Sequence, residues 1–307
     1  MPDTTLQTLD VAGLQSLLER AAEEGWNPGT GDARAFHRAD PDGYRARLVD
    51  GRFAAGISVV RQDADHAFLG LYIADPAHRG QGHGMALWRA ALAPFDGGSV
   101  GLDGVVAQQA NYARSGFVLA HRNVRWSGKV TDRATGRAEE QITGGSAASE
   151  GCGHAGDERT EASLRAPRRG DRDAMLALDA AVGGLRRERF IDAWCLDGTT
   201  EGRDTLVAER AGELVGLGTI RRCRGPHKIG PLIATDAHVA RSLLQALVRG
   251  SGAGGLMLDV PEPNRAGTAL AEGLGLAPVF ETARMYRGGA PIIDTSRLFG
   301  VATLELG

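Results

Sequence analysis

A glycine-rich segment between two apolar runs is the part of the sequence best suited to hold a ligand. It reads Arg79-Gly80-Gln81-Gly82-His83-Gly84. The apolar run 69–73 before it predicts a strand, and apolar residues at helical spacing over 85–92 predict a helix after it. At such a junction, unpaired backbone N–H groups face outward at the positive end of the helix dipole. Glycine leaves no Cβ atom to hold an anion away. The segment therefore predicts a loop that binds an anion.

Two common phosphate-binding motifs do not fit this loop. A mononucleotide P-loop needs Lys and Ser/Thr after its last glycine, where this chain has Met85 and Ala86. In the dinucleotide motif the third glycine would come one residue later, and no Asp75-Pro76 pair would separate the strand from the loop. The remaining pattern, Arg-x-x-Gly-x-Gly, resembles motif A of the GNAT N-acetyltransferases. The resemblance implies that Arg79 and the amides of Gly80, Gln81, Gly82, His83 and Gly84 hold the pyrophosphate of acetyl-CoA. An ordinary strand–loop–helix connection is the alternative.

A tyrosine at a fixed distance from a Gly-Phe pair suits proton donation. Tyr112 stands four residues before Gly116-Phe117. In GNAT enzymes this spacing implies the tyrosine that protonates the departing thiolate of CoA, and a tyrosine with a pKa of about 10 is protonated at neutral pH. The alternative is a half-buried helix residue that packs on the sheet. The resemblance also implies that the main chain of Leu71, Tyr72 and Ile73 lies against the thioester and the pantetheine arm.

No residue is marked as the general base. Glu24 is the first candidate, because the resemblance places the loop 24–28 at the wall of the acceptor site and implies that Trp26 and Asn27 contact the acceptor. A solvated glutamate beside a core tryptophan is an equal alternative. Asp75 and Asp103 are the next candidates, and a chain of water molecules could also serve.

The composition limits the classes of function. The chain has 307 residues, enough for two domains, and its 42% hydrophobic and 24% charged residues are typical of a globular protein. A net charge of −3 gives no electrostatic reason to expect nucleic acid or an anionic membrane as a partner. No apolar stretch approaches the roughly 20 residues of a membrane span, and the N-terminus does not resemble a signal peptide. Three widely spaced cysteines indicate neither a disulfide framework nor a metal site. We expect a cytoplasmic protein without a metal.

The hydrophobic pattern predicts one set of elements that occurs twice. The first set comprises a helix over 10–25, strands over 44–49 and 52–61 that turn at Asp50-Gly51, a strand over 68–73, the loop and its helix, a strand over 99–106, a helix over 108–115 and strands over 117–120 and 123–126. The second set comprises helices within 171–194, strands over 206–209, 214–220 and 229–234, a helix over 239–247, a strand over 256–260, a helix over 263–274 and a strand over 279–286. Residues 131–163 contain one large apolar side chain, Ile142, which predicts a mobile linker. Cys152-Gly153-His154 within it has no partner ligands.

The two sets differ at the loop. Where the first set has its loop, the second has the shorter segment 235–242, which contains no glycine, and it has Ala271 where the first has Tyr112. We therefore expect a donor site in the first set only. Many GNAT enzymes carry an asparagine seven residues before the tyrosine. This chain has Val105 there, while the second set keeps such a residue, Asn264.

Further segments resemble the bacterial two-domain YitH-type subgroup of GNAT proteins. They are residues 24–29, 39–43, 68–73, 101–106 and 284–288. We accordingly predict an α/β (α+β) protein with tandem GNAT folds, each a mixed, mostly antiparallel twisted sheet flanked by helices. The predicted parts are a catalytic domain at 1–128, a flexible linker at 129–163 and a degenerate domain at 164–307.

The resemblance implies an acetyl-CoA-dependent N-acetyltransferase that acts on a primary amine, with a small molecule favoured over a protein as acceptor. A non-catalytic acyl-CoA-binding or sensor protein is the alternative, and a purely structural pair of folds is a third reading. The sequence indicates neither the acceptor nor the oligomeric state.

Overall fold

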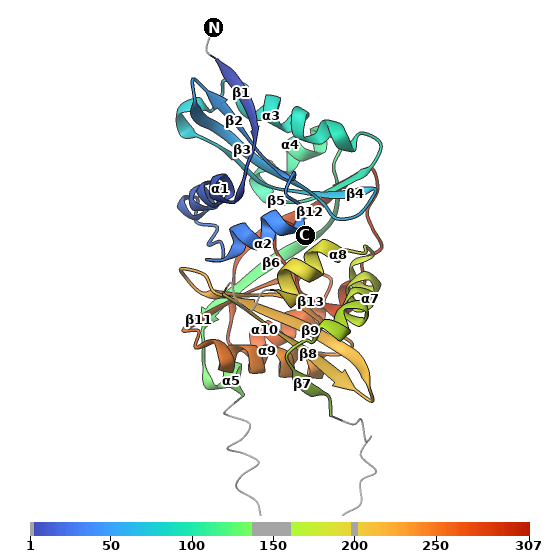
Figure 1. The fold of residues 1–307 in the computed structure, drawn as a ribbon. Coiled ribbons are helices and arrows are strands. Elements are labelled where there is room, and N and C mark those ends of the chain that lie inside the picture. Colours follow the sequence, from blue (N-terminus) through green and yellow to red (C-terminus); the bar gives the residue numbers. More distant parts are fainter. Residues whose placement is uncertain (1–2, 137–160, 198–201) are drawn as a thin grey trace, which may run out of the picture.

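The computed structural model describes residues 3–136, 161–197 and 202–307, which form two halves stacked one on the other (Figure 1). The strands of the N-terminal half are β1 (Thr4–Thr8), β2 (Tyr44–Val49), β3 (Arg52–Arg61), β4 (His66–Ala74), β5 (Ser99–Val105) and β6 (Val118–Lys129). Its helices are α1 (Val11–Glu23), α2 (Asp32–Ala39), α3 (His83–Leu92), α4 (Gln109–Arg114) and α5 (Asp132–Thr135).

The C-terminal half repeats much of this order. Its strands are β7 (Ser163–Arg165), β8 (Arg203–Arg210), β9 (Glu213–Arg221), β10 (His227–Ala234), β11 (Gly255–Pro261), β12 (Ala277–Arg287) and β13 (Leu298–Gly300). Its helices are α7 (Arg172–Gly183), α8 (Glu188–Phe190), α9 (Ala237–Ser251) and α10 (Arg265–Gly273).

The strands of the described residues form one 13-stranded sheet. Its order is β1-β2-β3-β4-β5-β12-β6-β11-β10-β9-β8-β7, with β13 paired to β10. The pairs β4–β5 and β10–β11 are parallel and the others are antiparallel, which confirms the predicted mixed, mostly antiparallel sheet. Two strands cross between the halves: β12 lies between β5 and β6, and β6 lies between β12 and β11. The two predicted sheets are therefore joined into one.

The N-terminal part of the sheet has two covered faces. On one face, Leu69, Leu102 and Met285 pack against Leu87 and Trp88 of α3. The opposite face packs on α1, α2 and the C-terminal half through a core that includes Leu71, Ile73, Phe36, Trp194 and Ile233. We call these the α3 face and the inner face. Because side chains alternate along a strand, each residue of β5 belongs to one of them.

Some predicted elements differ from those observed. The hairpin turn is confirmed, since Asp50 (φ 49°) and Gly51 (φ 75°) join β2 to β3. Strand β1 was not predicted, because all five of its residues are exposed and show no apolar alternation. The two predicted closing strands over 117–126 are one continuous strand, β6.

The predicted linker is wrong in its first residues. Lys129 ends β6, and α5 packs on α9 with Ala134 buried and with Gln245 Nε2 donating to the carbonyl of Arg133 at 3.1 Å. A single buried alanine, Ala134, is too weak a pattern for the sequence to predict that the short helix α5 packs on α9. Residues 137–160, with the Cys-Gly-His fragment at 152–154, lie outside the described residues. The domain boundaries stay a prediction, because β6 and β12 each run beside strands of the other half.

The last described residues, 301–307, lie between the two halves (Figure 1). Both halves approach this segment through a glycine. A Cβ atom on Gly70 of β4 would lie 2.4 Å from the carbonyl oxygen of Glu305, and one on Gly230 of β10 would lie 2.1 Å from that of Val301. The segment therefore lies against the inner face of β4.

Candidate active site

The first turn of α3 is open at its N-terminus. Gly82 is the N-cap in a left-handed conformation (φ 81°), and no side chain among the described residues caps the helix. Within the described residues, the backbone amides from Gly80 to Met85 donate no hydrogen bond. A helix start with free amides and no capping carboxylate is a favourable position for phosphate oxygens. The predicted anion-binding loop thus has the geometry that a pyrophosphate needs.

Side chains around the loop hold its shape. Arg79 donates to the carbonyl of Ala74 at 3.1 Å and forms an ion pair with Glu24 at 2.8 Å. Gln81 Nε2 donates to the carbonyl of Ala77 at 2.8 Å, and Arg47 Nε donates to His83 Nδ1 at 3.3 Å. The structure therefore brings together two predicted site residues, Arg79 and Glu24. Arg79 here braces the loop against the end of α1, and the role of Glu24 as a base stays a prediction.

Strand β4 leaves the regular ladder where the resemblance places the thioester. Its parallel pairing with β5 ends at Leu69 and Leu102. Beyond that point Leu71 has a positive φ of 47°, and the register with β3 shifts between Gly56 and Ser58. Such a bulge turns backbone groups away from the ladder. The bulge coincides with the predicted main-chain residues Leu71 and Tyr72, and the pattern of apolar residues gave no sign of it.

Tyr112 lies on the α3 face in a stack of aromatic rings. Its ring lies 6.0 Å from that of Trp88, which also contacts Tyr72 at 5.2 Å. A Cβ atom on Gly104 of β5 would lie 2.1 Å from Tyr112, so the glycine lets the ring lie against the strand. Burial, and secondarily Tyr72, raise the pKa of Tyr112 above its usual value. The phenol is therefore protonated at neutral pH and able to donate a proton.

A buried polar cluster lies on the inner face beside the same stretch of β5. We call it the β5-end cluster, and it consists of Asp103, His121, Asn123, Thr282 and Arg284. Arg284 binds both carboxylate oxygens of Asp103, at 2.8 and 2.5 Å, and Asn123 Nδ2 donates to the same carboxylate at 2.8 Å. Of these residues the sequence pointed only to Asp103 as a possible site residue. The others come from β6 and β12, and no local motif marks strands that the fold brings together across the chain.

The corresponding helix start in the C-terminal half is closed. The side chain of Asp236 accepts a hydrogen bond from the amide of Val239 at 2.9 Å and so caps α9. Although burial works to raise its pKa, this hydrogen bond and Arg210 hold the pKa of Asp236 below the usual value. A carboxylate thus takes the place that a phosphate would need. The predicted difference between the two loops has this physical basis.

The gap between β10 and β11 in the C-terminal half is also filled. Their parallel pairing ends at Ile229 and Leu258, and β13 pairs with β10 beyond that point. Asn264 donates from Nδ2 to the carbonyl of Leu298 at 2.9 Å, while its Oδ1 caps α10. The asparagine that the resemblance links to the cofactor arm therefore binds the chain itself.

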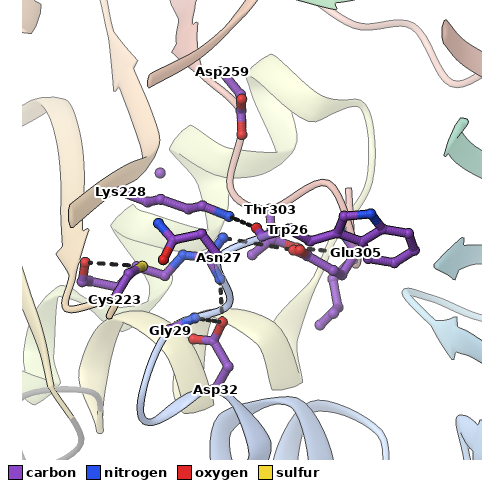
Figure 2. A network of polar contacts seen from close by, with 12 residues as sticks. Trp26, Asn27, Gly29, Asp32, Cys223, Lys228, Asp259, Thr303 and Glu305 are labelled. Atoms are coloured by element: carbon purple, nitrogen blue, oxygen red, sulfur yellow. Dashed lines mark hydrogen bonds and ion pairs between the residues drawn. The ribbon is translucent and has the colours of Figure 1, made fainter. Parts of the chain in front are cut away.

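The predicted acceptor contacts Trp26 and Asn27 lie at the seam between the halves (Figure 2). Asn27 donates to the carbonyl of Pro226 at 2.9 Å and accepts from the amide of Gly225 at 3.0 Å. Lys228 Nζ donates to the carbonyl of Trp26 at 2.9 Å, and burial with the nearby arginines lowers the pKa of Lys228 to about 8. Both residues hold the halves together here, and their contact with an acceptor stays a prediction.

Two cavities lie beside the C-terminal segment, away from the glycine loop. The larger, about 710 Å³, opens at the other end of the sheet and is lined by Asp40, Arg45, Arg61, Arg187 and Leu306 among others. The smaller, about 40 Å³, touches Phe68, Arg284 and Gly307. In the part of the chain that the structure describes, no group of His, Cys, Asp and Glu side chains could hold a metal ion, and no helix is long and apolar enough to cross a membrane.

The fold and the loop define a class of protein. A model of the acetyltransferase (GNAT) family matches residues 11–117, and a model of the acetyltransferase (GNAT) domain matches residues 175–300. The two matches fall in the two halves and together span most of the chain. The chain therefore belongs to the GNAT family of acyltransferases and carries tandem GNAT domains.

Individual relatives extend this result over the whole length. Holothin acyltransferase of Pseudoalteromonas sp. (strain SANK 73390) is 28% identical over 294 residues, which is 95% of this chain and 91% of the relative. A solved structure of a Pyrococcus horikoshii protein assigned as an acetyltransferase superposes with a TM-score of 0.75 at 18% identity, covering 99% of this chain and 96% of the other. A tandem GNAT protein from the clavulanic acid biosynthesis pathway superposes with a TM-score of 0.60 at 13% identity, covering 94% and 99%. At these identities the two structures support the fold alone.

Proposed function

We propose that this protein transfers an acetyl group from acetyl-CoA to a primary amine of a small molecule, and that its N-terminal half alone binds the donor. The observation that carries the proposal is the contrast between two helix starts. The amides at the start of α3 donate no hydrogen bond within the described part of the chain, whereas Asp236 caps the start of α9. A pyrophosphate can accept hydrogen bonds at the first and would meet a carboxylate at the second.

The residues around β5 suit the chemistry of acyl transfer. Acetyl-CoA supplies a thioester, whose carbonyl carbon the amine attacks. Tyr112 is protonated and lies against the end of β5, where it can give a proton to the departing sulfur. Backbone amides at the bulge of Leu71 and Tyr72 are candidates to stabilise the negative charge that develops on the carbonyl oxygen.

The relatives support a small-molecule acceptor. The name of the 28% identical Pseudoalteromonas protein states that it acylates holothin, and it matches this chain over nearly its whole length. We place the chain in the two-domain YitH-type subgroup on the segments that resemble it. Acetyl is the donor group that we propose, because the loop motif is that of acetyl-CoA enzymes.

Thermal unfolding with and without acetyl-CoA tests the donor site. We expect acetyl-CoA to raise the melting temperature, since a ligand that binds only the folded state stabilises it. Gly82→Asp should abolish this shift, because it strains a left-handed position and brings a negative charge to the phosphate site. The matched control is Gly212→Asp, a positive-φ turn between β8 and β9 far from the loop in sequence. An equal shift in the Gly82→Asp variant and the wild type would refute the proposed donor site.

A further inference from the structure

The β5-end cluster lies on the opposite side of β5 from the proposed proton donor. Asp103, on the inner face, and Gly104, against which Tyr112 packs on the α3 face, are consecutive residues of β5. Across the sheet, Asp103 pairs with Arg284, and Arg284 pairs with His121. Two residues further along each strand, Thr282 lies opposite Asn123. The cluster therefore flanks the end of β5, just beyond the last pair of the β4–β5 ladder.

Three polar atoms of this cluster make no hydrogen bond of normal length and angle within the residues that the structure describes. They are His121 Nε2, Asn123 Oδ1 and Thr282 Oγ1, each inaccessible to solvent. Asn123 is 1% exposed and Thr282 is 2% exposed. Buried polar atoms are normally paired, and leaving one unpaired costs roughly 1–3 kcal/mol. Three such atoms on two neighbouring strands indicate a position at which something outside the chain makes hydrogen bonds.

The unpartnered atoms require a ligand that donates N–H or O–H groups. Asn123 uses its Nδ2 as the donor to Asp103, which fixes the orientation of the amide and leaves Oδ1 as an acceptor. The hydroxyl of Thr282 can also accept a hydrogen bond, and so can a neutral imidazole. A primary amino group has two N–H bonds to give to such a set.

The charges around the cluster oppose a cation. The carboxylate of Asp103 is held by two hydrogen bonds from Arg284, so the pair carries no net charge. The next arginine on β6, Arg122, is paired with Glu281. Burial, and then Arg284, lower the pKa of His121 to about 4, although a polar contact with Asn123 works to raise it. A positive charge at this position is therefore unfavourable at neutral pH.

We propose that the β5-end cluster binds the amino group of the acceptor, and that the acceptor is an amine that is uncharged at neutral pH, such as an arylamine or an enamine. The proposal rests on the proposed function and names its substrate class. An uncharged amine already has the lone pair that attacks the thioester, so no strong base is needed to remove a proton first. This accounts for a site in which no general base stands out.

The proton balance of the step is complete with the residues at hand. The C–N bond forms as the C–S bond breaks, and Tyr112 gives its proton to the sulfur. The nitrogen becomes strongly acidic once it is bonded to the acyl carbon, so a weak base such as His121 Nε2 can accept its proton, directly or through water. The products are the N-acyl amine and the CoA thiol. The proton then returns from His121 to Tyr112 through solvent.

Two isomeric amines test the proposed substrate class. At pH 7.5, 4-methylaniline is uncharged and benzylamine is protonated, although their atoms are the same. We expect thiol release from acetyl-CoA to have a kcat/KM at least 10-fold higher with 4-methylaniline. Asn123→Asp, which adds a negative charge beside Asp103, should move this ratio toward benzylamine. A wild-type protein that prefers benzylamine overturns the proposal.

Substitutions of Thr282 test the site itself, with 4-methylaniline as the amine. Thr282→Val, which keeps the shape and removes the hydroxyl, should raise the KM for the amine about 10-fold and leave the KM for acetyl-CoA unchanged, and Thr282→Ser should restore the amine KM. The control is Tyr44→Phe, which removes a buried hydroxyl on β2 that also has no hydrogen-bond partner among the described residues. An unchanged amine KM in Thr282→Val, measured on a variant with normal thermal stability, refutes the site.

A binding measurement separates this proposal from the proposed function. If acetyl-CoA fails to stabilise the wild type and no amine releases thiol, the proposed function fails. Calorimetric titration of 4-methylaniline into the wild type and Thr282→Val needs no turnover. Binding that is weakened at least 10-fold in the variant supports the amine site, and absent or equal binding overturns it.

Discussion

At the scale of single residues, Tyr112 is the side chain on which the proposed chemistry most depends. Its ring packs against Gly104 and Trp88, so its position is fixed by β5 and α3 rather than by its own helix alone. We expect Tyr112→Phe to keep this packing and lose the proton, lowering kcat by about 100-fold with little change in the KM for acetyl-CoA. Steady-state thiol release measures both constants. A kcat within threefold of the wild type would mean that Tyr112 only packs on the sheet.

His121 gives a prediction about stability and pH. Its pKa is about 4 in the folded protein and 6.5 is the ordinary value, so between these pH values the unfolded chain binds more protons. The free energy of unfolding should therefore fall as the pH drops from 6.5 to 4, by at most about 3 kcal/mol from this residue, at 1.36 kcal/mol per pKa unit. Urea unfolding at several pH values measures it. His121→Gln should flatten this dependence, whereas the control His238→Gln, at an exposed position of α9, should not. A slope unchanged in His121→Gln would contradict the prediction.

Sequence reasoning predicted those candidate site residues that follow one another in a motif. The loop from Arg79 to Gly84 and Tyr112 were both predicted, because backbone anion sites and the Tyr–Gly-Phe spacing are local. Arg284 appeared only within a subgroup motif, and His121 and Asn123 did not appear at all. Their side chains meet because β12 inserts between β5 and β6, and no local pattern records which strands become neighbours.

At the scale of elements, the insertion of β12 links the two halves through a buried ion pair. The side chains of Asp103 and Arg284 are 0% and 5% exposed. Removing one partner leaves a buried charge uncompensated, so Arg284→Met should lower the free energy of unfolding by about 3–5 kcal/mol. The double variant Asp103→Asn with Arg284→Met should recover part of this loss. Arg122→Met, which breaks the more exposed pair with Glu281, is the control and should change little.

Denaturant unfolding followed by both tryptophan fluorescence and circular dichroism measures these differences. A loss under 1 kcal/mol in Arg284→Met would show that the contact between β5 and β12 does not depend on the ion pair.

The strands themselves were largely predicted, since β2, β3 and β4 have alternating or continuous apolar residues and are bounded by recognisable turns. The insertion of β12 between β5 and β6 was not predicted. The pattern of apolar residues alone would equally allow each of β6 and β12 to close the sheet of its own half.

At the scale of the whole molecule, the two halves share one fold and have diverged at the same two places. In the N-terminal half the first turn of α3 is open, and β4 and β5 pair only as far as Leu69 and Leu102. In the C-terminal half Asp236 caps α9, and β13 occupies the edge of β10 beyond its pairing with β11. There the chain itself fills the edge of β10, and Asn264 donates to the carbonyl of Leu298. The C-terminal half instead supplies Thr282 and Arg284 to the first half.

This arrangement predicts one donor site per chain. Calorimetric titration with acetyl-CoA should give a stoichiometry of one, and Gly82→Asp should reduce it to zero. Asn264→Ala should destabilise the protein, because it removes the cap of α10 and the hydrogen bond to Leu298, yet it should leave the stoichiometry at one. A stoichiometry of two, or one that persists in Gly82→Asp, would place a donor in the C-terminal half. In that case β13 would have to leave β10 on binding, and the hydrogen exchange of residues 298–300 would rise with acetyl-CoA.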